Sequence, residues 1–298
     1  GQMAGYAIQG YAPKRDEDKK PYSGRFFAPF DTKIAQQYDA AVREWDERKN
    51  ADLNDFWPRS GVPFGFMTAV ANSDLRENYG LTHWWTMFSP RQLLVHSLLL
   101  KAILTTGDHE WRVREFVLGA FHRYLQHQNM LCFWDIQQDC LAPSLSNSNF
   151  HPKSTVVENN VFAHLGRGNW NSSVDSLFEG LEWMRSPSEL VSNERLDDKS
   201  PGLSSQTTGK STKVIVGDSP SASEMLCVSS TDLYCHDDKS VDLVITDPPF
   251  GGLLHYSELS DFFYVWLRLA LKERYQEFLQ EYTPKNLEAV SNKEREPE

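Results

Sequence analysis

The stretch Val241-Asp242-Leu243-Val244-Ile245-Thr246-Asp247-Pro248-Pro249-Phe250 joins a run of apolar and β-branched residues to a turn that contains two prolines. An unbroken apolar run that ends in a turn is typical of a strand buried on both faces of a parallel sheet. A shorter run of the same kind covers residues 213–218, and apolar residues at helical spacing extend from residue 257 to about residue 277. This order of strand, strand and helix predicts an α/β fold at the C-terminal end of the chain.

The turn at residues 247–250 carries groups suited to chemistry on an aromatic amine. The exocyclic amine of adenine is a poor nucleophile because its lone pair is delocalised into the ring. The Asp247 carboxylate and the backbone carbonyl of Pro248 can accept the amine's protons, and neither Pro248 nor Pro249 has an N–H that would compete for these acceptors. The Phe250 ring offers a displaced base a face to stack on, worth about 1–3 kcal/mol. Asp247, Pro248, Pro249 and Phe250 are therefore the candidate catalytic residues, and a plain turn is the alternative.

A longer match surrounds this turn. Residues 242–250, followed by His255-Tyr256-Ser257-Glu258-Leu259-Ser260-Asp261-Phe262-Phe263-Tyr264-Val265-Trp266-Leu267-Arg268, resemble the large prokaryotic adenine-specific DNA methylases that carry a Zn-ribbon and a domain of unknown function. In that family a D-P-P-Y loop precedes a Y-S-x-L-S-D-F-F-Y-V-W-L-R helix. Upstream, Phe88-Ser89-Pro90-Arg91-Gln92-Leu93-Leu94 is similar to the family's F-x-x-R-Q-L-L helix start, and Glu158-Asn159-Asn160-Val161-Phe162 loosely resembles its E-x-N-P-F.

The resemblance implies an S-adenosylmethionine-dependent methyltransferase that acts on the exocyclic amine of adenine (N6) in DNA. It also implies part of a Rossmann-like methyltransferase sheet at the C-terminal end, with a mostly helical and irregular insertion before it. Asp218 ends the first expected strand, where such folds often place an acidic residue near the cofactor, so it is the candidate cofactor-binding residue. His255, Tyr256 and Ser257 follow the loop closely enough to contact the base or the DNA backbone, and they are the candidate substrate-binding residues.

Four positions in these segments allow a simpler reading. Ser257 is expected first of all to be the N-cap of the helix that follows the loop. Asp261 either supports the loop or is merely solvated in the first helical turn. For Arg91 and Gln92, packing at a helix start is favoured over contact with DNA. No metal ligand is expected.

The sequence departs from the family in three respects. Phe250 replaces the usual Tyr, which keeps the stacking ring, and the Zn-ribbon cysteines are absent. The family's glycine-rich D-P-F-x-G-x-G cofactor loop also has no counterpart. The glycines within residues 61–65 and 166–168 follow no apolar strand, so neither set is expected to be that loop. The chain is therefore expected to be an incomplete portion, with the cofactor loop supplied by a missing N-terminal segment or a second chain.

The rest of the sequence divides into segments of different composition. Residues 1–31 are expected to be extended, residues 32–185 mostly helical and related to target recognition, and residues 186–212, rich in Ser, Thr and Gly, a flexible linker. Residues 213–285 form the methyltransferase part, and residues 286–298 a charged tail. Helices are expected over residues 32–49, 90–107 and 110–127, the second with Ser89 as N-cap and Pro90 in its first turn.

Composition constrains the partners. A formal net charge of −11 disfavours tight DNA binding by this chain alone, because duplex binding depends on Lys and Arg neutralising phosphates. Four cysteines without a C-x-x-C pair indicate free thiols in the cytoplasm, and the chain shows neither a signal peptide nor a membrane span. DNA is still the expected substrate. Cytosine N4 and an RNA amine are close alternatives, and a non-catalytic, methylase-derived binding or assembly subunit is the alternative from another class.

Overall fold

The computed structural model describes residues 4–13, 22–71, 74–107, 110–192, 211–215, 234–247, 251–252, 254–286, 288 and 290. Helices predominate among these residues, and the strands form three separate two-stranded antiparallel sheets. The elements are, in chain order, β1 (Ala7–Pro13), β2 (Tyr22–Pro29), α1 (Thr32–Arg48), a π-helix η1 (Phe66–Val70), α2 (Leu75–Tyr79), a 3-10 helix η2 (Trp84–Met87), α3 (Pro90–Thr105), α4 (Trp111–Leu125), β3 (Phe133–Asp135), β4 (Cys140–Ala142), α5 (Trp170–Arg185), β5 (Ser188–Ser192), β6 (Ser211–Ile215), α6 (Tyr256–Leu271) and a 3-10 helix η3 (Gln276–Phe278).

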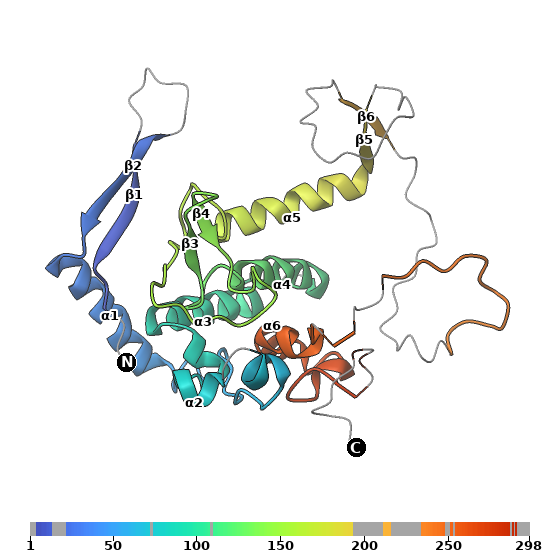
Figure 1. Ribbon diagram of the computed structural model, residues 1–298, viewed down its shortest axis with the longest axis horizontal. Helices are drawn as coiled ribbons and strands as arrows, with labels where there is room; N and C mark the ends of the chain where they lie inside the picture. Colours follow the sequence, from blue (N-terminus) through green and yellow to red (C-terminus); the bar gives the residue numbers. More distant parts are fainter. Residues whose placement is uncertain are drawn as a thin grey trace.

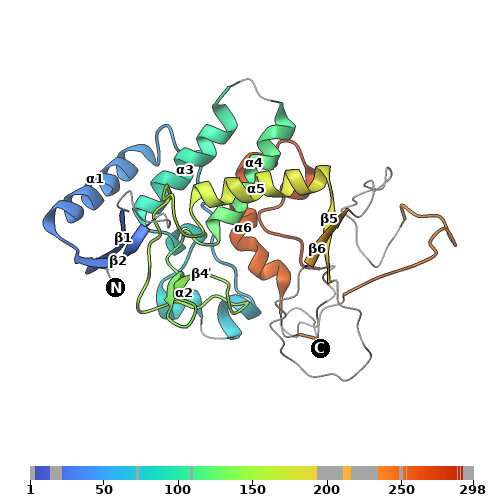
Figure 2. The ribbon, with the colours of Figure 1, turned by 90° about the horizontal axis from the view of Figure 1, so that it is seen from above.

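The helices α3, α4 and α6 form the centre of the molecule, with α1 against α3 and α5 against α4 (Figures 1 and 2). The hairpin β1–β2 projects from one side, and the pair β5–β6 lies at the far end of α5. An ion pair between Arg25 of β2 and Asp139 connects the hairpin to the β3–β4 turn. Within the described residues, no helix is both long enough and apolar enough to cross a bilayer.

The core is built around α6, although α6 lies about 150 residues after α3 and α4 in the chain. The Trp266 side chain is fully buried, and its ring makes edge contacts with the rings of Phe88, His96 and Phe121 at centroid distances of 5.4, 5.7 and 6.0 Å. Phe262 lies one turn earlier and stacks on Phe88 at 5.5 Å. The segment that follows the DPPF sequence is therefore the central helix of this core.

The start of α3 confirms the expected cap. The Ser89 hydroxyl accepts a hydrogen bond from the Gln92 backbone N–H at 3.2 Å, and the Gln92 side chain accepts one from the Ser89 N–H at 3.0 Å. Pro90 occupies the first turn, where its missing N–H costs nothing. Gln92 thus packs in the core and caps the helix, in agreement with the prediction that favoured packing over contact with DNA.

Removal of this cap gives a first prediction. Ser89→Ala is expected to lower the free energy of unfolding by about 1–2 kcal/mol, because the Gln92 N–H loses its acceptor and the Glu158 carboxylate loses a donor. Ser97→Ala, in the same helix, is the matched control. The Ser97 hydroxyl is buried and has no hydrogen-bond partner among the described residues, so this change should be neutral or stabilising. Equal losses for both variants in urea unfolding would contradict the cap assignment.

The core also contains a neutral histidine. The His96 side chain is fully buried, with Nε2 2.8 Å from the Gln128 carbonyl oxygen and Nδ1 3.0 Å from the Tyr124 hydroxyl. Burial lowers the pKa of His96 to about 4 from the ordinary value of 6.5. Burial also lowers the pKa of His127 to about 4. Both groups take up a proton more readily in the unfolded chain than in the folded one.

Stability should therefore depend on pH in a defined window. Because the folded pKa is depressed, the contribution of His96 is fully present above about pH 6.5 and is lost as the pH falls towards 4, by up to about 3 kcal/mol. His96→Gln should lower stability at pH 7 but flatten the curve of unfolding free energy between pH 6.5 and 4. In this variant His127 still titrates, so the unfolding free energy keeps a smaller dependence on pH of the same sign. An unchanged slope in the variant would show that His96 is not the group that titrates.

The expected Rossmann-like sheet is not formed within the described residues. Residues 241–247 have no regular secondary structure, and β6 pairs antiparallel with β5, which lies in the expected linker. The physical reason is that a strand needs a neighbour to satisfy its backbone N–H and C=O groups, and none of the described strands lies beside residues 241–246. The mixed α/β composition agrees with the expectation, whereas the parallel sheet does not.

Candidate functional site

The candidate loop begins on an exposed part of the chain. Residues 234–247 leave the helical core and form the outlying orange arc at the right of Figure 1. The side chains of Val241, Leu243, Val244 and Ile245 are 50–85% exposed, and Asp247 is exposed as well. Of the other predicted residues, Pro248, Pro249, Phe250 and Asp218 lie outside the described residues. The Asp247 carboxylate is thus open to solvent and to a large substrate.

His255 takes a different place from the one expected. Its imidazole is buried and stacks on the Phe66 ring of η1, with centroids 4.5 Å apart and planes at 17°. Its Nε2 lies 3.2 Å from the carbonyl oxygen of Gly252, within hydrogen-bond distance of the chain just after the loop. The His255 imidazole is therefore enclosed by other residues of the protein. The predicted contact with a base fits Tyr256 better, because the Tyr256 side chain is exposed.

Glu258, one turn into α6, holds the same region together. One carboxylate oxygen accepts a hydrogen bond from the Met67 N–H at 2.8 Å, and the other lies 3.4 Å from Nδ1 of His255. The carboxylate also lies directly against Gly65, where a Cβ atom would approach it to 2.5 Å. Glu258 was not among the site residues predicted from the sequence. The sequence offered one clue, the position of Glu258 in the Y-S-E-L start of the helix. Residue type alone does not distinguish such a buried glutamate from a solvated one.

The N-cap assignment to Ser257 is wrong. α6 begins at Tyr256 with His255 in the cap position, so Ser257 is already in the first turn. Its hydroxyl and its backbone N–H both donate to the carboxylate of Glu288, the latter at 2.8 Å. The first turn of α6 is thus held by a downstream residue rather than by its own serine.

Asp261 is buried rather than solvated. Its carboxylate accepts hydrogen bonds from the Thr283 N–H at 2.9 Å and the Thr283 hydroxyl at 2.7 Å, and it pairs with Lys285 at 2.7 Å. Burial raises the pKa of Asp261, and the Lys285 ammonium opposes this shift. The nearby Tyr282 hydroxyl donates to the Gly61 carbonyl at 2.9 Å. Asp261 therefore anchors the segment after α6 to the helix, which supports the loop end of α6 indirectly.

Two family-like segments that lie far apart in the sequence meet in space. The Glu158 carboxylate accepts a hydrogen bond from the Ser89 hydroxyl and forms an ion pair with Arg91, whose guanidinium lies 5.1 Å from the centre of the Tyr38 ring. Arg91 thus has a packing role. The sequence named these segments separately but did not predict their contact, because pairing over 67 residues leaves no local pattern.

In each glycine segment, one glycine lies against a side chain of the protein. Gly65 faces the Glu258 carboxylate, and a Cβ at Gly168 would lie 2.2 Å from the His127 side chain. Gly166 and Gly168 have φ angles of 82° and 74°, so they are required by the backbone of this turn. The close approaches at Gly65 and Gly168 are thus made within the protein, whereas a Cβ at Gly166 would meet no atom within 4 Å.

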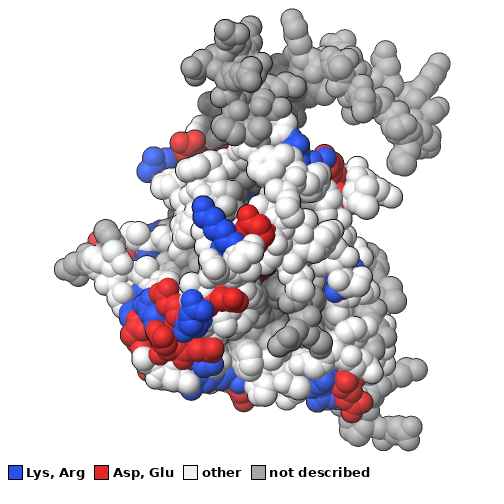
Figure 3. All heavy atoms as spheres, turned by 90° about the vertical axis from the view of Figure 1, so that its left-hand side faces the viewer, with Lys and Arg blue, Asp and Glu red and all other residues white. Residues whose placement is uncertain are grey.

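Charge on the described surface is mixed. On the face shown in Figure 3, basic and acidic side chains lie next to one another. Arg48 pairs with Glu44 and Asp52 at 2.8 and 2.7 Å, and Lys101 pairs with Asp52 at 2.8 Å. On this part of the surface, basic side chains are therefore neutralised by acidic neighbours instead of forming a stripe for phosphates.

The structure thus brings His255, Glu258 and the residues 65–67 together beneath the start of α6, while Asp247 lies outside this cluster on the exposed arc. No protein-family model, curated protein or solved structure matches the chain.

Proposed function

We propose that residues 247–250 form the catalytic loop of an S-adenosylmethionine-dependent methyltransferase acting on adenine N6 in DNA. The observation that carries the proposal is the sequence D-P-P-F joined to H-Y-S-E-L-S-D-F-F-Y-V-W-L-R, whose second part folds as α6. A buried helix fixed by His255, Glu258 and Asp261 gives the residues after the loop a firm attachment. Exposure of Asp247 suits a substrate as large as a nucleic acid.

In this proposal the loop acts on the amine rather than on the donor. The Asp247 carboxylate and the Pro248 carbonyl would accept hydrogen bonds from the two N–H groups of the amine, which directs the nitrogen lone pair out of the ring plane. Phe250 stacks on the base once it has left the duplex and offsets part of the unpairing cost. The methyl donor supplies an electrophilic methyl group. Gly65 and Gly168 lie against side chains of the protein, and we place the donor's site at residues outside the described ones, such as Asp218, or on a second chain.

Two enzymatic alternatives share the same loop chemistry, namely cytosine N4 in DNA and an exocyclic amine in RNA. The nucleoside that carries the methyl group distinguishes all three. The local acceptors are the same in each case, so the loop by itself does not select the base.

A second class of function is supported by a different observation. The apolar side chains of residues 241–245 are exposed and unpaired with any described strand, as expected for a surface that another chain covers. A non-catalytic subunit derived from a methylase, which binds or assembles with a partner, would use this surface. The acidic net charge favours this alternative, and the intact D-P-P-F sequence favours the enzyme.

Calorimetric titration of S-adenosylmethionine into the whole chain separates the two classes. The enzyme proposal predicts binding on the order of micromolar, as is usual for enzyme ligands. Asp218→Ala should weaken this binding at least about tenfold, as expected when a charged hydrogen-bond acceptor is lost. Asp238→Ala, at an exposed acidic residue, is the matched control and should bind as the unaltered chain does. No heat of binding would mean that the cofactor site lies outside this chain, on a partner or a missing segment, or that the chain is an assembly subunit. Methyl transfer in the presence of a chain that supplies the glycine-rich loop would then distinguish a split enzyme from an assembly subunit.

A further inference from the structure

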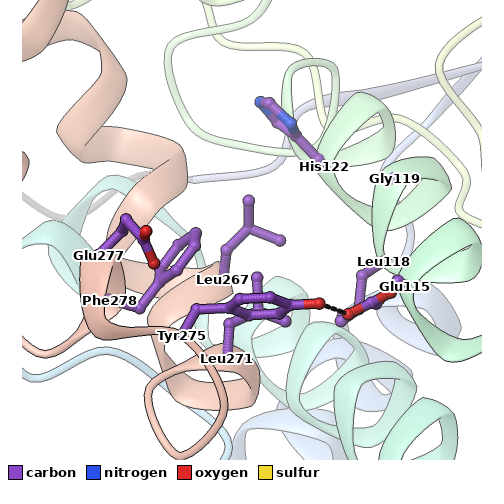
Figure 4. A pocket seen from close by; sticks show the side chains of 9 residues that line it. All are labelled: Glu115, Leu118, Gly119, His122, Leu267, Leu271, Tyr275, Glu277 and Phe278. Atoms are coloured by element: carbon purple, nitrogen blue, oxygen red, sulfur yellow. Dashed lines mark hydrogen bonds between the residues drawn. The ribbon is translucent and has the colours of Figure 1, made fainter. Parts of the chain in front are cut away.

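A cavity of about 530 Å³ opens between α4, the C-terminal half of α6 and η3 (Figure 4). Its volume lies within the range of small-molecule sites in proteins. The cavity lies at the opposite end of α6 from the DPPF sequence, so it is separate from the candidate loop. Nothing in the proposed methyl transfer uses it.

Most of the cavity wall is apolar. Leu118 of α4 and Leu267 and Leu271 of α6 form its floor, and the Phe278 ring closes one side. Phe278 is fixed because its other face stacks on the Tyr264 ring, with centroids 5.1 Å apart and planes at 7°. A ligand of this cavity must therefore have an apolar body, since leucine side chains cannot replace the water around a polar one.

The polar groups at the rim carry negative charge. Glu115 and Glu277 line the cavity from α4 and η3, and they lie on opposite sides of it in Figure 4. The Glu115 carboxylate is oriented by two donors, the Trp111 indole N–H at 2.7 Å and the Tyr275 hydroxyl. Within the described part of the chain, no hydrogen bond or ion pair engages the Glu277 carboxylate. Glu277 is therefore the rim group with free acceptor capacity.

No side chain of opposite charge balances these carboxylates within the cavity lining that the structure describes. His122 is the one lining residue that could become a cation. Its ring packs on Phe263, with centroids 4.4 Å apart, and burial lowers the pKa of His122, so the imidazole is neutral at pH 7. Arg274 is close by, but its guanidinium lies 4.5 Å from the centre of the Trp111 ring and is not part of the lining. The charged side chains of the described lining, Glu115 and Glu277, would therefore repel an anionic ligand.

We propose that this cavity binds a small organic cation, an alkyl- or arylammonium compound, with its apolar body on the leucines and its ammonium group at the Glu277 carboxylate. Three features carry the proposal: an apolar cavity of ligand size, a carboxylate on either side of it, and the absence of a cation among its described lining residues. The inference does not depend on the methyltransferase proposal, because it uses none of the residues 247–257.

Three probes with one apolar body test the charge selection. We would titrate 4-phenylbutylammonium, 4-phenylbutanol and 4-phenylbutyrate into the whole ¹⁵N-labelled chain and follow amide shifts by NMR. For a probe of this size, the ammonium compound is expected to bind with a dissociation constant on the order of 1 mM. It should bind about five- to tenfold more tightly than the alcohol, a preference typical of partly exposed carboxylates. The carboxylate probe should not bind. Equal binding of ammonium and alcohol, or any stronger binding of the carboxylate, would overturn the proposal.

Two glycines provide a blocking variant and its matched control. A Cβ at Gly119 of α4, which lines the cavity, or at Gly180 of α5, which does not, meets no atom within 4 Å. Gly119→Met should fill the cavity and abolish binding, whereas Gly180→Met should leave it unchanged, and both variants should stay folded because Met favours helix over Gly. Glu277→Gln should remove most of the ammonium's advantage over the alcohol without affecting binding of the alcohol. Retained binding in Gly119→Met would place the ligand elsewhere and contradict the proposal.

Discussion

Asp247→Ala is expected to lower the rate of methyl transfer to DNA by at least roughly a hundredfold, the usual scale for loss of a group that stabilises charge in the transition state. The reason is that the adenine amine loses the acceptor that withdraws its proton as the nitrogen bonds to the methyl carbon. The measurement is the initial rate of label transfer from methyl-labelled S-adenosylmethionine. The free energy of unfolding should not change, because Asp247 is exposed and belongs to the segment 234–247, which lies outside the helical core.

Asp242→Ala is the matched control for this prediction. Asp242 is exposed on the same segment five residues earlier, so its replacement makes an equal change in charge near the loop. The rate of methyl transfer should be close to that of the unaltered chain, and the unfolding midpoints of both variants should agree with it. Equal losses in the two variants would mean that charge on the segment, rather than the Asp247 carboxylate, matters.

Trp266→Ala is expected to lower the free energy of unfolding by about 3–5 kcal/mol, as for large aromatic residues replaced in a core. Domain stabilities of about 5–15 kcal/mol make this a large fraction of the total. Trp266 is fully buried and contacts rings from α3, α4 and the segment before α3, so its removal leaves a cavity that three elements would have to fill.

Trp183→Ala, at a half-exposed position of α5, controls for the loss of a tryptophan and should cost less than about 1 kcal/mol. Trp266→Phe should cost less than Trp266→Ala, since it keeps a ring and removes an indole N–H that has no hydrogen-bond partner among the described residues. The midpoints of urea unfolding measure all three changes. Similar losses for Trp266→Ala and Trp183→Ala would contradict the central place given to α6 in the core.

The helices were largely predictable because their signals are local. The spacing of apolar residues and the Ser89-Pro90 start placed α1, α3, α4 and the beginning of α6 close to their bounds. The end of α6 was placed too late, because the helix stops at Leu271 and not near residue 277. The N-cap of α6 was misplaced, since Ser257 is a good cap by residue type and only a contact with Glu288 explains its place in the first turn. Local sequence preferences thus determine where a helix forms, whereas contacts with distant residues determine at which residue it begins.

The strands and the buried polar residues were less predictable. The run at 241–246 has the composition of a buried strand, but burial depends on neighbouring strands that a single segment does not specify. Likewise, the sequence around Asp261 is compatible with a solvated helix residue. In the structure Asp261 is buried because Lys285 and Thr283, from the segment after α6, bind its carboxylate. In the candidate site, the sequence predicts the loop at residues 247–250 and its chemistry, and of these residues the structure describes Asp247. It did not indicate that Glu258 and His255 would pack against residues 65–67, almost 200 residues earlier.

Identification of the methylated nucleoside tests the assignment of residues 247–250 most directly. The whole chain is incubated with S-adenosylmethionine labelled in its methyl group and with duplex DNA, and the DNA is then digested to nucleosides and separated. The predicted result is label in N6-methyldeoxyadenosine with the unaltered chain and with Asp242→Ala, and none with Asp247→Ala. Label confined to a nucleoside other than N6-methyldeoxyadenosine, or equal labelling with Asp247→Ala, would contradict the proposal.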